Sequence, residues 1–290
     1  MKFPARPVEF LIEGLIRVCG LSAIVFILAI FGFIGKEGLA FLGSHLVEML
    51  TSTDWSPTAE TPVFGLVALL VGTFWCVGLS LFFSVPVGLA AAIYLSEFSG
   101  ERTKEVLKII VELLAAIPSV VWGFIGVMIL NPLLQAGGAQ VGLNGVNGAI
   151  VLALMTLPLL VSLGEDALRA VPESYRQAAM AMGATKWEMV RRVLLPAASR
   201  GLLVAVLLGI GRCVGETMAV LMVTGHAVRI PSTLFDPVRT LTATIAAELG
   251  EAVRGGEHYQ ALFALGVLLF VLTFVVNLIA DRAIRGRATS

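Results

Sequence analysis

The sequence predicts an all-α, polytopic membrane protein with six transmembrane helices, built as one domain over residues 1–290. Apolar residues make up 58% of the chain, charged residues only 14%, and the mean hydropathy is +0.94. A water-soluble domain of this length does not need so many apolar residues, whereas each membrane-spanning helix needs a run of about 20 of them. The apolar residues are indeed gathered in such runs.

The runs predict six spans in chain order: 16–35, 64–95, 106–130, 148–164, 201–225 and 260–280. The first is followed by GFIGKEG, which lacks the small-residue pattern of a signal-peptide cleavage site, so we expect this helix to be retained. We expect the core of the domain to cover about 64–280, with the first helix peripheral to it.

Lysine and arginine predict the orientation. The two termini and the segments 96–108 and 165–200 carry fifteen of the twenty Lys and Arg residues, and the opposite segments carry four. Positive residues concentrate on the cytoplasmic side of membrane proteins. Both termini are therefore expected in the cytoplasm of a cell with an inner membrane, with 36–63, 131–147 and 226–259 outside.

Composition and motifs argue against several classes of function. The three cysteines and three histidines show no CxxC or HExxH spacing, so we expect neither a metal site nor an intramembrane enzyme. No GxxxxGK[ST] segment occurs, so the chain is expected to bind no nucleotide or other cofactor. Its net charge of zero gives no reason to expect a nucleic-acid partner.

The segment 165–200, between the fourth and fifth runs, is longer than a simple connector. Pro172 suits the start of a short helix, Gly183 predicts a turn, and a second short helix is expected from Thr185 to Leu195. Apolar residues at helical spacing in this loop favour a soluble partner that docks there. By physical chemistry alone, a pair of amphipathic helices on the lipid surface is the alternative.

This loop resembles that of the permease subunits of type I ABC importers, which has the form EAA, three residues, Gly, nine residues, then an apolar residue, one residue and Leu-Pro. The residues on that spacing are Ala178, Ala179, Gly183, Val193, Leu195 and Pro196, with Gln177 in place of the usual Glu. The resemblance implies that the loop is a coupling helix that fits a cytoplasmic ATPase dimer, and that ATP is bound by this partner.

Two charges lie inside the fifth run. Arg212 is about 16 Å along the predicted helix, near mid-bilayer, and Glu216 follows four residues later on the same helix face. A charge there is expensive, so it is expected to face protein or water with a partner. An ion pair that only joins helices is one interpretation. The other is a pathway site, with Thr217 as a further lining residue, because the guanidinium suits bidentate recognition of oxyanions.

The third run contains another charge and a proline. Glu112 lies four residues after Lys108, and we expect the two to form an ion pair near the membrane interface. Pro118 predicts a kink in the same helix.

The stretch GRCVGETMAVLMVTG, 211–225, resembles the fifth-span region of phosphate-specific ABC permeases of the PstC type, with support from VPVGLAAAIYLSEF and AAIPSVVWGF. The resemblance covers most of residues 65–225. It implies a permease that forms half of a phosphate pathway, with a PstA-type permease, a cytoplasmic ATPase dimer and an extracytoplasmic phosphate-binding protein as partners. Arg212 and Glu216 fall on the family's pathway charges.

Two other functions stay open at this point. The chemistry of the residues does not separate phosphate from another tetrahedral oxyanion. A secondary anion transporter driven by a proton gradient is the rival from another class, and it would not need a docking loop.

Overall fold

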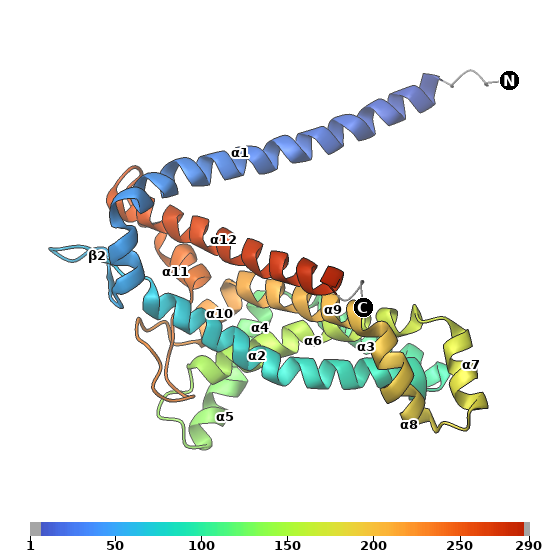
Figure 1. The fold of residues 1–290 in the computed structure, drawn as a ribbon. Coiled ribbons are helices and arrows are strands. Elements are labelled where there is room, and N and C mark those ends of the chain that lie inside the picture. The colour runs from blue at the N-terminus through green and yellow to red at the C-terminus, as the bar shows by residue number, and fades with distance from the viewer. Residues whose placement is uncertain (1–6, 287–290) are drawn as a thin grey trace.

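A computed structural model describes residues 7–286, and most of this part of the chain is helical (Figure 1). Within it, six helical stretches are long and apolar enough to cross a membrane: Ile12–Thr51, Val67–Phe98, Ser119–Ala136, Gly145–Arg169, Lys186–Gly215 and Glu257–Ile279. Each overlaps one predicted run. The all-α class with six spans is therefore confirmed.

Helix α1 (Pro7–Thr51) is longer than the predicted span 16–35. It continues through Lys36 because its last turns pack against α12 (Glu257–Gly286), where Phe41 and Met49 are buried beside Leu265. Its N-terminal half extends away from the other helices, and its apolar side chains are exposed in this chain (Figure 1).

A short hairpin of β1 (Trp55–Ser56) and β2 (Val63–Phe64) leads from α1 into α2 (Val67–Ile93), which ends in the wide π-helical turn η1 (Tyr94–Phe98). Helix α2 packs along α6 (Gly145–Arg169), the most buried span. The two helices approach closely at Gly88, where an added Cβ would lie only 2.8 Å from Leu160 Cβ. Small residues permit this kind of close packing between membrane helices.

The predicted continuous helix over 106–130 is wrong. Helix α3 (Glu101–Ala116) ends at Ala116, and a new helix, α4 (Ser119–Ile125), starts after Pro118; the linking residues Ile117 and Pro118 both have extended backbone angles. The residue before a proline avoids the helical region, so Pro118 breaks the helix instead of kinking it. The chain then passes through η2 (Gly126–Leu130) and α5 (Asn131–Ala136).

The loop between the fourth and fifth spans holds two helical segments, α7 (Glu173–Ala181) and α8 (Lys186–Met189). The second was expected to stop at Pro196, which is wrong. It continues through the π-helical turn η3 (Val190–Leu194) into α9 (Leu195–Gly215). Pro196 has no N–H to donate, and the widened turn before it accommodates this loss.

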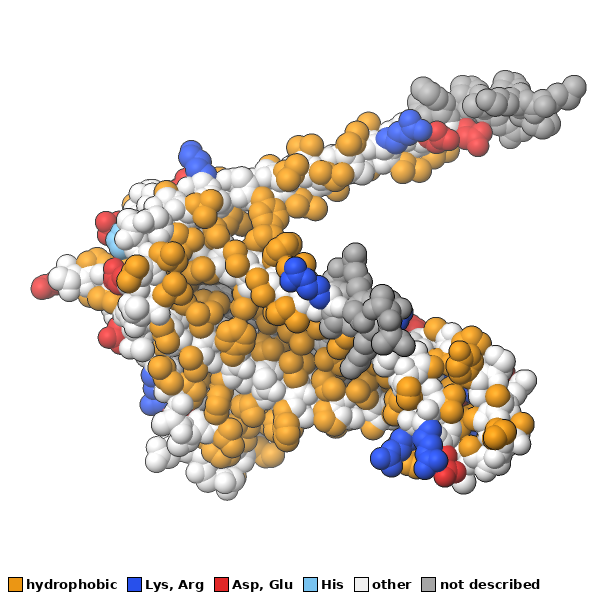
Figure 2. All heavy atoms as spheres, viewed as in Figure 1, with side chains coloured by type: hydrophobic (Ala, Val, Ile, Leu, Met, Phe, Trp, Pro, Cys, Tyr) orange, Lys and Arg blue, Asp and Glu red, His pale blue; other side chains and the backbone are white. Residues whose placement is uncertain are grey.

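The fifth span is also interrupted. Helix α9 ends at Gly215, Glu216 is extended, and a short helix, α10 (Met218–Val223), follows. The external segment after α10 contains α11 (Leu241–Glu248), and α12 completes the fold. Figure 2 shows hydrophobic side chains over the middle of the molecule and along α1, with the visible charged side chains mostly toward the helix ends. This distribution suits a protein that lies in a bilayer.

Candidate functional site

The first candidate site is the interruption between α9 and α10. Because Glu216 is the first residue after α9, with φ −69° and ψ 131°, it does not share a helix face with Arg212. Among the described residues, no ion pair within 4.0 Å joins the two side chains. The predicted same-face arrangement of Arg212 and Glu216 is therefore wrong.

Glu216 instead caps α10. Its carboxylate oxygen Oε1 accepts hydrogen bonds from the backbone N–H groups of Thr217, at 3.1 Å, and Ala219, at 3.3 Å. A negative charge at a helix N-terminus is stabilised by the free N–H groups there. The interruption thus has a built-in acceptor, which fixes the direction in which α10 leaves the break.

The break is also held from α11. The Thr242 hydroxyl donates to the backbone carbonyl of Glu216 at 2.8 Å, and Thr240 caps α11 by accepting from Ala243 N–H. The Thr217 hydroxyl donates to the carbonyl of Gly215, and that of Thr224 to Val220, so both serve backbone carbonyls as expected for hydroxyls in membrane helices. A groove of about 510 Å³ starts at Gly215 and Thr217 and continues over α11.

Arg212 lies in the last turn of α9, with its side chain exposed on the surface of this chain. The next residue, about 100° around the helix, is buried: Cys213 Sγ lies 3.1 Å from Thr156 Oγ1 and 3.5 Å from Ser80 Oγ. A Cβ at Gly209 would contact Thr156, whereas nothing lies within 4 Å of one at Gly211 or Gly215. Arg212 therefore lies on a helix face that this chain leaves uncovered, beside two glycines that leave room for a neighbour.

The second candidate site is the loop formed by α7 and α8. The predicted helix, glycine turn and second helix are confirmed, with Gly183 at φ +80°. The Thr185 hydroxyl accepts from Glu188 N–H, and the Glu188 carboxylate accepts from Thr185 N–H at 3.0 Å, so a capping box starts α8. This local chemistry is why the turn could be predicted from sequence.

The residues expected to meet an ATPase do not all face the same way. Gln177, Ala178, Gly183 and Pro196 are exposed, Val193 and Leu195 are half-buried, and Ala179 is buried against the ends of the membrane helices. The structure brings Ala178, Gly183 and Val193 together around a cavity of about 790 Å³. Large apolar side chains near it are exposed as well, including Met182 at 88%. An apolar surface of this kind on a polar loop is typical of a docking site.

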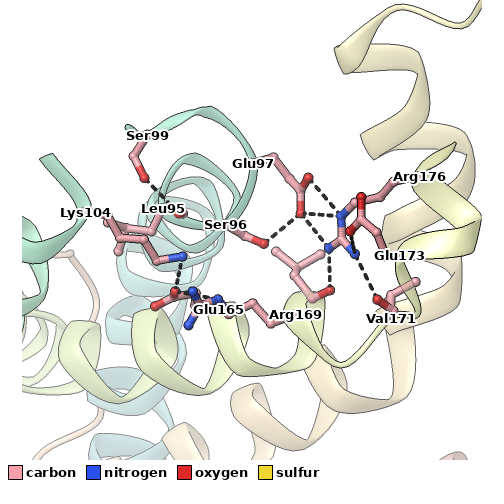
Figure 3. Close-up of polar contacts among 11 residues, drawn as sticks. Leu95, Ser96, Glu97, Ser99, Lys104, Glu165, Arg169, Val171, Glu173 and Arg176 are labelled. Carbon is pink, nitrogen blue, oxygen red and sulfur yellow. Dashed lines mark hydrogen bonds and ion pairs between the residues drawn. The ribbon is translucent and has the colours of Figure 1, made fainter. Parts of the chain in front are cut away.

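At the end of α6 next to this loop, sequence reasoning missed Glu165, which is only 1% exposed. Lys104 Nζ lies 2.7 Å from its Oε1 and Arg169 lies 3.4 Å away (Figure 3). Lys108 Nζ lies 3.1 Å from Glu165 Oε2. The predicted pair of Lys108 with Glu112 is wrong, because Glu165 draws the Lys108 ammonium to α6. This contact joins α3 to α6.

Glu165→Gln is expected to lower the stability of the protein in detergent by about 1.5–3 kcal/mol, because it leaves the Lys104 ammonium, which is only 16% exposed, without its main counter-charge. The expected fall in melting temperature is roughly 3–10 °C for a chain of this size. Glu112→Gln, which removes an exposed carboxylate four residues after Lys108, is the matched control. Equal melting temperatures for the two variants would contradict this role of Glu165.

A family model for the inner membrane component of binding-protein-dependent transport systems matches residues 84–288. The chain belongs to this family. The permease is 38% identical over 269 residues to the probable ABC transporter permease protein YqgH of Bacillus subtilis, covering 91% of this chain and 87% of that protein. It is 38% identical over 253 residues to the phosphate transport system permease protein PstC of Mesorhizobium japonicum, covering 80% and 76%.

Solved structures agree in fold. The permease superposes on a chain of a bacterial alginate ABC transporter with a TM-score of 0.69, 19% identity and 96% coverage of both chains. With the methionine ABC transporter MetNI the TM-score is 0.60 at 22% identity, covering 76% of this chain and 95% of that one. The predicted type I ABC importer permease fold and the resemblance to PstC-type permeases are confirmed.

The protein is therefore a multi-pass inner membrane protein and a transport subunit. Permeases of this family work with a second permease, an ATPase and a substrate-binding protein. In this chain, most residues of the α7–α8 loop and the Arg212 side of α9 are exposed.

Proposed function

We propose that this permease forms half of the translocation pathway of an ATP-driven importer of inorganic phosphate. Its partners are a PstA-type permease, a cytoplasmic ATPase dimer that binds the ATP, and an extracytoplasmic phosphate-binding protein. The chain itself binds no nucleotide. Phosphate is the favoured substrate because the PstC-named relatives, 38% identical in one case, are phosphate transport permeases.

The main support for the proposal is the position of Arg212. Its guanidinium is exposed at the broken end of α9, and no carboxylate of the described residues lies within 4.0 Å of it. The nearest acid in sequence, Glu216, is engaged in capping α10. A cation on an apolar membrane helix is costly unless a water-filled space or an anion meets it. A phosphate in the space between two permeases supplies that anion, and the five-donor fork of arginine fits its oxygens.

The proposed orientation places both termini in the cytoplasm. The distribution of Lys and Arg supports it, since fifteen of twenty lie on one set of segments. The described ends of α1 and α12 nearest the termini lie toward the side of the molecule that holds α7 and α8, opposite the β hairpin (Figure 1). The loop that meets the ATPase is then on the cytoplasmic side, as coupling requires.

The proposed mechanism is alternating access. Closure of the ATPase dimer moves α7 and α8, and the helices that carry Arg212 shift between an outward-open and an inward-open arrangement. One guanidinium attracts a phosphate without holding it tightly, so the ion can leave, and selectivity lies largely with the external binding protein.

The test uses the permease purified from membranes together with the ATPase and second permease that accompany it, reconstituted in vesicles with the binding protein. We expect ATP-dependent uptake of labelled phosphate that excess unlabelled phosphate suppresses and excess sulfate does not. Uptake suppressed equally by sulfate would assign the permease to a broader class of oxyanions. Uptake driven by a proton gradient without ATP would overturn the proposal.

A further inference from the structure

Arg176, on α7, reaches both membrane helices that end beside the loop. Its guanidinium donates to the Glu97 carboxylate, with Nη2 2.8 Å from Oε1 and Nε 3.2 Å from Oε2. It also donates to the backbone carbonyls of Leu168 and Val171, each at 2.9 Å (Figure 3). Glu97 belongs to η1 at the end of the α2 span, and Leu168 to the last turn of α6. One side chain therefore ties α7 to the ends of two spans.

The contact is well shielded from water. The Arg176 side chain is 15% exposed and that of Glu97 is 6% exposed. Ser96 donates a further hydrogen bond to Glu97 Oε1 at 2.7 Å. The hydrogen bonds to Glu97 raise the pKa of Arg176 above its usual range, so the guanidinium is charged at every physiological pH. A buried pair with this many hydrogen bonds fixes the geometry of the elements it joins.

Beyond the pair, the packing continues to Arg212. Helices α2 and α6 are in close contact along their length, as at Gly88 and Leu160. Helix α6 packs in turn against α9, where Gly209 meets Thr156. The sequence of contacts from α7 to the proposed pathway residue is therefore continuous: Arg176, then the ends of α2 and α6, then α9.

We propose that the pair of Arg176 and Glu97 is the joint that transmits movement of α7 to α2 and α6, which makes Arg176 a positioning residue for transport. The inference rests on the proposed function, in which the ATPase moves α7. Ala179 adds an apolar contact between α7 and the same region, near Ala92 and Leu168. The hydrogen bonds of the Arg176 guanidinium are directional, so they constrain the orientation of α7 as well as its distance from α2 and α6.

The test measures ATP hydrolysed per phosphate imported by the reconstituted complex. Arg176→Gln and Glu97→Gln are each expected to lower phosphate import per ATP roughly tenfold while ATP hydrolysis continues, which is within the usual range of coupling between sites. The double variant is expected to be no worse than Arg176→Gln alone, because that substitution already removes the contact with Glu97. The matched control is Glu173→Gln, which removes an exposed carboxylate 3.4 Å from the same guanidinium and joins no second element.

A conservative substitution at Arg176 distinguishes a positioning role from a role in folding. Arg176→Lys keeps the charge but loses the planar fork, so import per ATP is expected to recover only in part. An unchanged ratio of phosphate to ATP in both single variants would overturn the inference. So would failure of both variants to copurify with the ATPase, since the pair would then serve assembly and not movement.

A second readout does not depend on the substrate. Gly211→Cys, in a chain with Cys19→Ser, places a thiol beside Arg212 at a position with nothing within 4 Å of the new Cβ. We expect ATP to change its rate of modification by a thiol reagent, and Glu97→Gln to abolish that change. If the complex imports no phosphate, the proposed substrate is wrong, yet this experiment still tests the joint: an ATP response that persists in Glu97→Gln would overturn it.

Discussion

Arg212→Gln is expected to reduce phosphate uptake by the reconstituted complex roughly a hundredfold, the effect of losing about 3 kcal/mol of charge-assisted hydrogen bonding to the anion. Assembly with the ATPase is expected to be unchanged, because the Arg212 side chain is exposed in this chain and α9 packs through other residues such as Cys213. Labelled phosphate uptake and copurification of the ATPase measure the two effects.

The control for this prediction is Arg102→Gln, which removes an exposed cation at the start of α3, away from the break between α9 and α10. Arg212→Lys tests the chemistry further. It keeps the charge but not the bidentate fork, so an intermediate rate is expected. Uptake at the normal rate in Arg212→Gln would remove this residue from the pathway.

The second large effect is expected at the turn between α7 and α8. Gly183 has φ +80°, a backbone conformation that a β-branched residue adopts only with strain, so Gly183→Val is expected to cost about 1–2 kcal/mol locally. The turn then reorients, and with it the exposed surface of Ala178 and Met182. We expect phosphate-dependent ATP hydrolysis to fall roughly tenfold because the ATPase docks poorly.

Gly100→Val is the matched control for the turn. Gly100 lies immediately before α3 on the same side of the molecule and, like Gly183, has nothing within 4 Å of a Cβ, but its φ is −73°, which valine adopts freely. If both valine variants hydrolyse ATP normally in the presence of phosphate and the binding protein, the docking role of this turn is wrong.

The features that could be predicted from sequence are those set by local chemistry. Apolar runs of membrane length predicted the spans, Gly183 predicted the turn, and the second helix was expected to start at Thr185, which is the N-cap of α8. The extension of α1 past Lys36 could not be predicted in this way, because burial of Phe41 and Met49 against α12 stabilises it. Hydropathy shows that a segment is apolar, but it does not show which helix packs against that segment.

The interruption of the fifth span depends on a contact with a distant segment, whereas that of the third span follows from a proline. The break at Glu216 is held by Thr242, 26 residues further along the chain, and by capping of α10. Sequence spacing alone placed Glu216 on the Arg212 helix face because it assumed an unbroken helix. Pro118 gave a local signal, yet helix kink and helix break share that signal, and the extended angles at Ile117 decide between them.

Ion pairs between elements were the least predictable. Lys108 had an acid four residues away in Glu112, but the structure pairs it with Glu165 on another helix. Arg176 and Glu97 are separated by 79 residues, and nothing in either local sequence indicates the other. A search for opposite charges at the cytoplasmic ends of predicted spans would have found both acids without assigning their partners.

The central claim is that the guanidinium of Arg212 faces the pathway between two permeases and meets phosphate there. The most direct test is a structure of the assembled complex, with the second permease, the ATPase dimer and phosphate present. We predict that Arg212 points into a hydrated space between the two permeases, with phosphate oxygens within hydrogen-bonding distance. An Arg212 side chain that lies against lipid, or that is sealed with a carboxylate in a dry helix interface, would contradict the claim.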